Sequence, residues 1–196
     1  MDYIEYTVRV YPDGSQYWYK NGKLHREDGP AIVYPSGKKE WFKNGERHRE
    51  DGPAIIFPDG QKEWYKNGKL HREDGPAIVY PSGQKEWIKN GKLHREDGPA
   101  LITCFDTQYW YKDGKLHRED GPAVIFPDGE EHWYREGERH REDGPAVIYS
   151  DGDIYFYLEG FAYSQEEFEK KTKVTKELSV KDVEKLLGYP VKIVKG

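Results

Sequence analysis

Residues 25–47, HREDGPAIVYPSGKKEWFKNGER, are one unit of a tandem repeat that occupies most of this 196-residue chain. The string HREDGPA begins at His25 and begins again 23 residues later at His48. It recurs with the same spacing at His71, His94, His117 and His140, and the six tryptophans keep the same period at Trp18, Trp41, Trp64, Trp87, Trp110 and Trp133. A fixed period of about 20 to 50 residues indicates a repeat architecture in which each unit packs on its neighbours.

Each unit predicts a β-hairpin. Residues 31–34 are β-branched and aromatic, and they lie between the turn dipeptide Gly-Pro and the turn Pro-Ser-Gly. Residues 40–43 are a second such run, closed by Asn44-Gly45. Two short runs joined by a glycine-containing turn are typical of a hairpin. With residues 8–11 and Phe156 as the outer copies, we expect an all-β repeat protein over residues 1–163: an elongated, single-layer antiparallel β-meander of about seven hairpins.

The repeat stops after Tyr163, and residues 164–196 predict a small C-terminal helical cap. Ser164 with Glu167 three residues later is a capping box, which opens a helix. A second helical signal follows in residues 179–188, with an apolar stripe closed by Gly188. Repeat proteins need their last unit covered, so we expect the cap to cover the open edge of the final hairpin. A helix that docks a partner is the alternative.

Composition limits the class of protein. Charged residues make up 34% of the chain, but the net charge is only −5, which argues against a polybasic nucleic-acid binder and against an acidic DNA mimic. The 6 Trp, 16 Tyr and 7 Phe supply enough large rings for a folded core. No apolar run reaches membrane-spanning length, and the single Cys104 fits a reducing compartment. We therefore expect a soluble, cytoplasmic protein without a membrane partner.

The repeat resembles the MORN family, specifically its bacterial and phage variant with Trp-Tyr-x-Asn-Gly and His-x-x-x-Gly-Pro signatures. The resemblance covers roughly residues 3–163 and is best seen in residues 41–53, WFKNGERHREDGP. It implies hairpins stacked into an elongated single-layer sheet, and it is similar to proteins described as antitoxins and as phage products. The His-Arg-Glu-Asp tetrad, which we call the HRED loop, departs from the simpler Gly-x-Gly spacing of a MORN unit.

The HRED loops and one irregular turn supply the candidate binding residues. Stacked repeats align equivalent side chains in rows spaced by about 9.6 Å, two strand separations. Rows of arginine and histidine could grip phosphates or the carboxylates of a partner, whereas a structural role, with arginine paired to glutamate of the next copy, is the alternative. At residues 103–107 the usual Pro and Gly are missing, so Phe105 is a candidate exposed anchor or the product of drift in a turn. The candidates are Arg26, Arg49, Arg72, Arg95, Arg118, Arg141, His48, His71, His94, His117 and Phe105.

These patterns favour a binding protein over an enzyme. Every candidate acid or base occurs six times, with no unique catalytic constellation, and neither a cofactor nor a metal site is expected. We expect the tryptophans to form core, and we expect a non-enzymatic inhibitor, antitoxin-like or directed by a phage against host defence, that engages a protein partner through its long surface. The alternatives are a protein that sequesters small anionic signalling nucleotides and a structural scaffold that self-assembles through the strand at residues 8–11.

Overall fold

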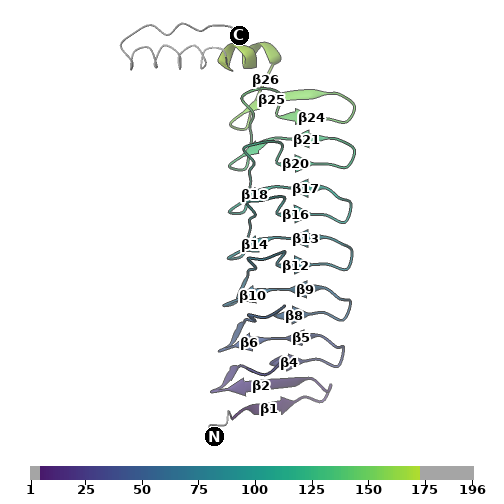
Figure 1. The fold of residues 1–196 in the computed structure, drawn as a ribbon, viewed down its shortest axis with the longest axis vertical. Helices are drawn as coiled ribbons and strands as arrows, with labels where there is room; N and C mark the ends of the chain where they lie inside the picture. Colours follow the sequence, from purple (N-terminus) through teal and green to yellow (C-terminus); the bar gives the residue numbers. More distant parts are fainter. Residues whose placement is uncertain (1–4, 173–196) are drawn as a thin grey trace, which may run out of the picture.

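The computed structural model describes residues 5–172, which form a narrow column of β-hairpins stacked along one axis (Figure 1). Most strands belong to one 16-stranded antiparallel sheet, here called the main sheet. Its strands are, in spatial order, β1 (Thr7–Val10), β2 (Gln16–Lys20), β4 (Ile32–Val33), β5 (Lys39–Glu40), β8 (Ile55–Ile56), β9 (Lys62–Glu63), β12 (Ile78–Val79), β13 (Lys85–Glu86), β16 (Leu101–Ile102), β17 (Gln108–Tyr109), β20 (Val124–Ile125), β21 (Glu131–His132), β24 (Val147–Ile148), β25 (Ile154–Leu158) and β26 (Phe161–Tyr163), with β3 (Lys23–Leu24) paired to β2. The predicted elongated all-β meander is confirmed.

Seven hairpins of the main sheet, β1–β2 to β24–β25, follow one another along the column, as the repeat predicts. Their turns explain the Pro-Ser-Gly signature. In the β4–β5 hairpin, Tyr34 N donates to Lys38 O at 3.0 Å and Gly37 N donates to Tyr34 O at 2.9 Å. Gly37 has a φ of +90°, a left-handed conformation that glycine adopts without strain. Proline and glycine therefore define a three-residue turn at the tip of this hairpin and of the others that carry the signature.

Each repeat contains a second, smaller hairpin that the sequence did not predict. Residues 40–43 were expected to form one strand, but β5 ends at Glu40 and a separate two-stranded sheet begins at Phe42. We call these small sheets the side hairpins: β6 (Phe42–Lys43) with β7 (Glu46–Arg47), β10 (Tyr65–Lys66) with β11 (Lys69–Leu70), β14 (Ile88–Lys89) with β15 (Lys92–Leu93), β18 (Tyr111–Lys112) with β19 (Lys115–Leu116), and β22 (Tyr134–Arg135) with β23 (Glu138–Arg139). Asn44 and Gly45 have φ of +55° and +91°, the geometry of a tight two-residue turn.

The repeat tryptophan is the corner between the two hairpins. Trp41 N donates to Ala54 O at 2.8 Å, on the side of the main sheet, whereas Trp41 O accepts from His48 N at 3.1 Å, beyond the side hairpin. These two backbone bonds, to the residue before β8 and to the residue after β7, accompany the turn of the chain out of the main sheet at Trp41. The sequence alternation cannot show this, because both partners lie outside the run that suggested a single strand.

Two backbone hydrogen bonds that recur along the column hold successive parts of the repeat array together. Gly45 N donates to Leu24 O at 2.8 Å, which joins the turn of the β6–β7 side hairpin to β3. Arg26 N donates to Phe42 O at 3.3 Å, which ties an HRED loop to the following side hairpin. Each repeat is thus held by nearest-neighbour contacts, as in other solenoid-like proteins.

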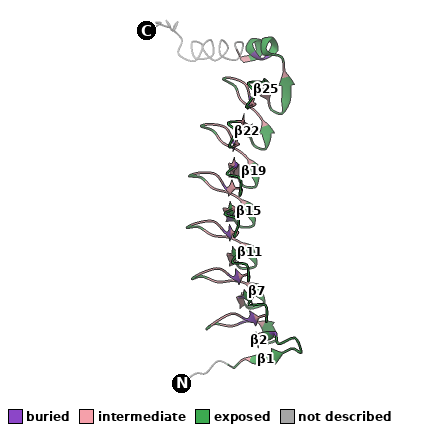
Figure 2. Cartoon of the chain, turned by 90° about the vertical axis from the view of Figure 1, so that its right-hand side faces the viewer, coloured by how far each residue is buried: buried purple, intermediate pink, exposed green. Residues whose placement is uncertain are grey.

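The buried residues form a thin spine along the column rather than a round core (Figure 2). The alanines that end the HREDGPA strings, Ala31, Ala54, Ala77, Ala100, Ala123 and Ala146, are all 0% exposed. Main-sheet residues such as Ile55 and Val147 are buried beside them. A larger side chain at these fully buried positions would have to displace its neighbours, and overpacking of this kind destabilises a core.

The C-terminal helix covers the end of the column, and residues 165–172 of it lie within the described part of the chain. The predicted capping box is present: Ser164 N donates to Glu167 Oε2 at 2.9 Å, and Glu167 N donates to Ser164 Oγ at 3.3 Å. Phe168 is buried, and its ring centre lies 4.8 Å from that of Phe156. The helical signal at residues 179–188 lies outside the described residues. Among the helices that the structure describes, none has the length and apolar character needed to cross a membrane.

Candidate binding surface

The arginine of each HRED loop lies over the ring of the tryptophan that precedes it by eight residues in the chain. The guanidinium carbon is 4.0 to 4.2 Å from the ring centre in all six copies. At this distance a guanidinium is attracted to the electron-rich ring face. The arginine side chains are only 22 to 24% exposed. The tryptophans are partly buried. The expected tryptophan core is therefore a row of rings, and the arginine side chains cover one face of each ring.

Hydrogen bonds fix each arginine further within its own loop. Arg72 Nε donates to Asp74 Oδ1 at 2.8 Å, and Arg72 Nη1 donates to Pro76 O at 3.3 Å. The same two bonds recur in the other five loops. The structural alternative, in which arginine pairs with glutamate of the next copy, is therefore wrong in its partner: the ion pair is with aspartate of the same copy. The Arg72 guanidinium holds the pKa of Asp74 below its usual value.

The glycine of the HRED loop makes room for this arginine. A Cβ atom added to Gly75 would lie 3.0 Å from Arg72 Cζ, a contact tighter than most real Cβ contacts, so the guanidinium would have to shift. The equivalent distances in the other five copies are 3.0 to 3.3 Å. The glycines of these loops lie outside the left-handed region of φ, so the required property is the missing side chain and not the backbone conformation.

The histidine of each HRED loop braces the side-hairpin turn that follows it in the chain. The backbone N–H of the residue at the following side-hairpin turn donates to histidine Nδ1, as from Asn44 to His25 at 3.0 Å and from Asn90 to His71 at 3.2 Å. The candidate residues His48, His71, His94 and His117 have side chains only 9 to 12% exposed. This position explains a structural need for histidine and leaves little of each ring exposed.

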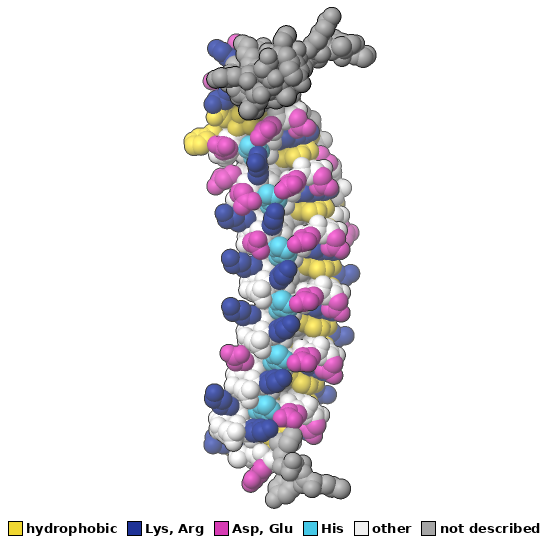
Figure 3. Space-filling model, turned by 60° about the vertical axis from the view of Figure 1, so that its left-hand side comes forward, with side chains coloured by type: hydrophobic (Ala, Val, Ile, Leu, Met, Phe, Trp, Pro, Cys, Tyr) yellow, Lys and Arg dark blue, Asp and Glu magenta, His cyan; other side chains and the backbone are white. Residues whose placement is uncertain are grey.

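The carboxylates of the HRED loops are the side chains that face solvent. Glu96 and Asp97 are 85% and 83% exposed, and Glu119 and Asp120 are 83% and 82% exposed. Figure 3 shows these acidic residues in rows beside a column of histidines and basic side chains, with hydrophobic side chains between the acidic rows. The sequence reasoning favoured the arginines and histidines and omitted the carboxylates, although the same tetrad contains all of them.

A groove lies between each pair of neighbouring HRED loops from the loop of Arg49 to the loop of Arg141. Trp64, Trp87, Trp110 and Trp133 line four grooves of about 920, 700, 750 and 870 Å³, respectively. In the groove at Trp110, one wall is residues 95–99, the other is residues 117–120, and Lys112 also lines the space. The structure thus brings together the arginine, histidine and carboxylate rows as a series of equivalent grooves.

The HRED glutamates of the end copies form ion pairs with a lysine or an arginine, and within the described part of the chain those of the central copies do not. Lys20 pairs with Glu27 at 3.1 Å, and Arg135 pairs with Glu142 at 3.2 Å. Lys43 lies 3.7 Å from Glu50. Among the described residues, the central glutamates Glu73, Glu96 and Glu119 have no lysine or arginine within ion-pair distance, and their nearest charged partner is the histidine of the same loop. The central grooves therefore present their glutamates without a neutralising lysine.

Phe105 is exposed, as predicted, but it lies away from the grooves. It is 78% exposed at the tip of the β16–β17 hairpin and lines none of the four grooves. The tip keeps its turn without Pro and Gly, because Asp106 adopts a φ of +61° and Thr103 Oγ1 accepts from Thr107 N at 3.1 Å. The structure does not combine Phe105 and the HRED loops into one site.

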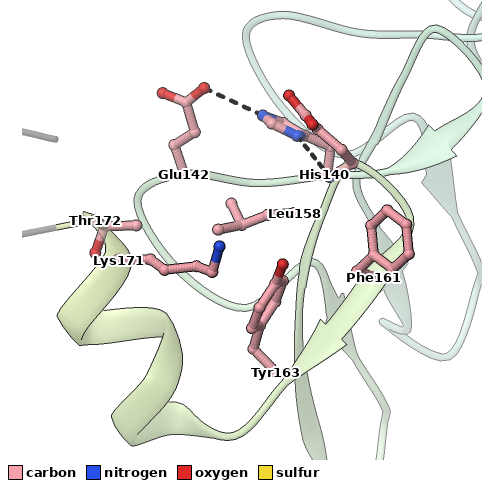
Figure 4. A pocket seen from close by; sticks show the side chains of 8 residues that line it. His140, Glu142, Leu158, Phe161, Tyr163, Lys171 and Thr172 are labelled. Atoms are coloured by element: carbon pink, nitrogen blue, oxygen red, sulfur yellow. Dashed lines mark hydrogen bonds and ion pairs between the residues drawn. The ribbon is translucent and has the colours of Figure 1, made fainter.

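A pocket of about 510 Å³ marks the end of the groove series (Figure 4). Tyr163 stands where the next histidine would lie, and Leu158 stands where the next lysine would lie. Lys171 of the helix lies 5.1 Å from the Tyr163 ring centre. The Phe168–Phe156 contact replaces the arginine–tryptophan contact of the repeats, so the cap imitates the packing of another HRED loop.

A scan against protein-family models and a search of curated proteins return no match for this chain. The resemblance to MORN variants thus stands on the repeat motifs alone.

Proposed function

We propose that this protein is a non-enzymatic repeat scaffold that binds a protein partner along the face formed by its HRED loops and inhibits that partner. The observation that carries the proposal is the series of similar grooves between rigid loops, each with solvent-exposed carboxylates. Arginine, tryptophan and glycine lock every loop internally, so binding would order few side chains, and preorganised surfaces bind with a smaller entropic cost. The resemblance to antitoxin-like and phage MORN variants supports an inhibitor directed at a toxin or a defence protein.

Capture from a bacterial lysate, with identification of the retained protein, tests this function. The full-length chain is compared with Glu73→Gln/Glu96→Gln, which removes two central carboxylates without touching the arginine–aspartate pairs. The matched control is Glu46→Gln/Glu138→Gln, which changes net charge equally on the exposed side hairpins. We expect one protein to be retained by the parent and the control, and to be lost with the central variant. Equal retention by all three chains, or no retained protein, contradicts the proposal.

For the identified partner, an activity measurement separates inhibition from simple binding. The partner's activity is expected to fall in proportion to added parent protein and to be unaffected by the central variant at the same concentration. An active partner in a saturated complex would contradict the inhibitory part of the proposal and leave binding intact.

Self-assembly is a second candidate, supported by the exposed edge of the main sheet. Val8 and Val10 of β1 are 47% and 68% exposed, and Tyr11 is 41% exposed. An unprotected apolar edge strand is a template for pairing with another chain. Sedimentation velocity of the parent and of Val8→Lys/Val10→Lys over a hundredfold range of concentration tests it. Assembly predicts concentration-dependent growth that the variant abolishes, whereas a constant sedimentation coefficient contradicts it.

Sequestration of anionic nucleotides has less support. The arginines that would hold phosphate already bond aspartate and proline oxygens, and the groups that face solvent at the loop tips are carboxylates, which repel phosphate.

A further inference from the structure

We infer that the grooves bind an extended, cationic segment of a partner protein, with one basic side chain in each groove and a basic residue at every third position. This inference deepens the proposed function, on which it rests, by naming the chemistry and spacing of the segment that the HRED face recognises.

The sign of the exposed charge selects a cationic side chain. In the groove at Trp110, the two walls present Glu96, Asp97, Glu119 and Asp120, each more than four-fifths exposed. The arginines of the same walls are less than one-quarter exposed and already bonded. A lysine or arginine entering between these walls therefore approaches carboxylates of both loops, and charge-assisted hydrogen bonds are the strong ones.

The floor and one wall of the groove add contacts that carboxylates alone would not provide. Trp110 lines the groove and can pack against the aliphatic part of a long basic side chain. His117 also lines it, with a side chain 10% exposed and a buried Nε2 atom that has no hydrogen-bond partner among the described residues. Glu119 lies 3.6 Å from this nitrogen, too far for a hydrogen bond. The groove wall thus contains a buried polar atom that the described residues leave without a hydrogen bond.

The central lysines suit the main chain of such a segment. Lys66, Lys89 and Lys112 are exposed, each lines one of the grooves, and each is free of a glutamate partner among the described residues. An ammonium group is a donor for the backbone carbonyl oxygens that an extended segment leaves unpaired. The acidic groove walls would contact the basic side chains of the segment, and the lysines would contact its carbonyl oxygens. Because both sets of groups follow the column, the segment would lie parallel to the column axis.

The repeat spacing selects an extended segment with a period of three. Neighbouring grooves are separated by two strands, about 9.6 Å. A polyproline II segment advances about 9.3 Å in three residues, a mismatch of about 1 Å over four grooves. Basic residues spaced by two or four residues in the same conformation would be about 6.2 or 12.4 Å apart and would leave register after one groove. Only the three-residue spacing fills all four grooves.

Fluorescence anisotropy with synthetic peptides tests this inference on the full-length chain. The probe is a fluorescein-labelled 15-residue peptide of five Arg-Ser-Pro units. Two isomers with the same composition place the five arginines at alternate positions or together at one end. We expect the Arg-Ser-Pro peptide to bind at least about tenfold more tightly than either isomer at physiological salt, because only this peptide can fill successive grooves. Equal affinities for the three isomers overturn the period of three.

Protein variants test the site. Glu73→Gln/Glu96→Gln/Glu119→Gln should weaken the Arg-Ser-Pro peptide by at least about tenfold, because it removes one carboxylate from each central loop. Glu46→Gln/Glu131→Gln/Glu138→Gln has the same net charge and should weaken it less than about twofold. Equal losses in both variants would show binding by net charge alone and would overturn the site. If the peptides show no preference but the captured partner still depends on Glu73 and Glu96, this inference fails alone; loss of both results removes the proposed function as well.

Discussion

The guanidinium carbon of Arg72 lies 4.1 Å from the centre of the Trp64 ring. This contact gives the arginine row a structural role beside the tryptophan row, whereas the sequence suggested that arginine serves binding and tryptophan forms core. The arginine covers a ring that would otherwise face solvent, and the ring holds the arginine away from partners.

Replacing Arg72 and Arg95 with alanine should therefore destabilise the protein. Each change removes a cation–π contact and the bonds to aspartate and proline oxygens, and we expect a loss of about 1–3 kcal/mol per site. Urea unfolding followed by tryptophan fluorescence measures it. The matched controls are Lys62→Ala and Lys85→Ala, exposed cations on the main sheet. Unfolding midpoints like those of the parent would show that the arginine row is free to serve a partner, as the sequence first suggested.

Gly75→Ala should destabilise the fold through Arg72. The new Cβ would lie 3.0 Å from Arg72 Cζ and push the guanidinium off Trp64. We expect about 1–2 kcal/mol, within the range for overpacking. In an Arg72→Ala background the same change should cost much less, because its steric partner is gone. Additive effects in this double-mutant cycle would contradict the proposed clash.

Asp106→Gly should stabilise the protein. Asp106 holds a φ of +61° at the last position of the β16–β17 turn. The other main-sheet hairpins have glycine at this position, such as Gly83 with a φ of +91°. Removing the left-handed strain is expected to gain about 0.5–1 kcal/mol. Thermal unfolding of the variant and of Thr103→Val, which loses an acceptor for Thr107 N, should give opposite shifts. A lower melting temperature for Asp106→Gly would contradict the strain.

Glu40→Gln should produce a pH-dependent loss of stability. Glu40 is 2% exposed, and it pairs with Lys38 Nζ at 2.8 Å and Arg47 Nε at 3.0 Å. Burial alone would raise its pKa, but the bonds and charges of Lys38 and Arg47 outweigh burial and hold the pKa of Glu40 below its ordinary value of 4.5. A lowered folded pKa contributes stability that is present above that ordinary value and is lost as pH falls through the folded pKa.

We therefore expect Glu40→Gln to lose about 1–3 kcal/mol at pH 7 and to approach the parent as the pH falls well below 4.5. Urea unfolding at a series of pH values gives this difference directly. A gap between the two proteins that is constant with pH would show that the charge on Glu40 contributes nothing.

The sequence predicted the parts of the fold that depend on local signals. The period of 23 residues, the tip turns and the capping box at Ser164 are all legible from neighbouring residues, and the structure confirms them. The corner at Trp41 was missed because its backbone partners, Ala54 and His48, lie outside residues 40–43, the run that suggested a single strand. The orientation of the HRED loop was missed for the same reason: Arg72 and Trp64 become neighbours only after the chain has turned through a side hairpin.

The brace from His71 to the amide of Asn90 recurs at the same sequence separation, from His25 to Asn44 onward. A gene that gains or loses a whole unit by unequal recombination would therefore keep every such bond, because the cut ends present the same donors and acceptors. Its product would differ in reach alone, in steps of about 9.6 Å. The number of repeats can therefore change the length of the binding face during evolution while the contacts between repeats stay the same.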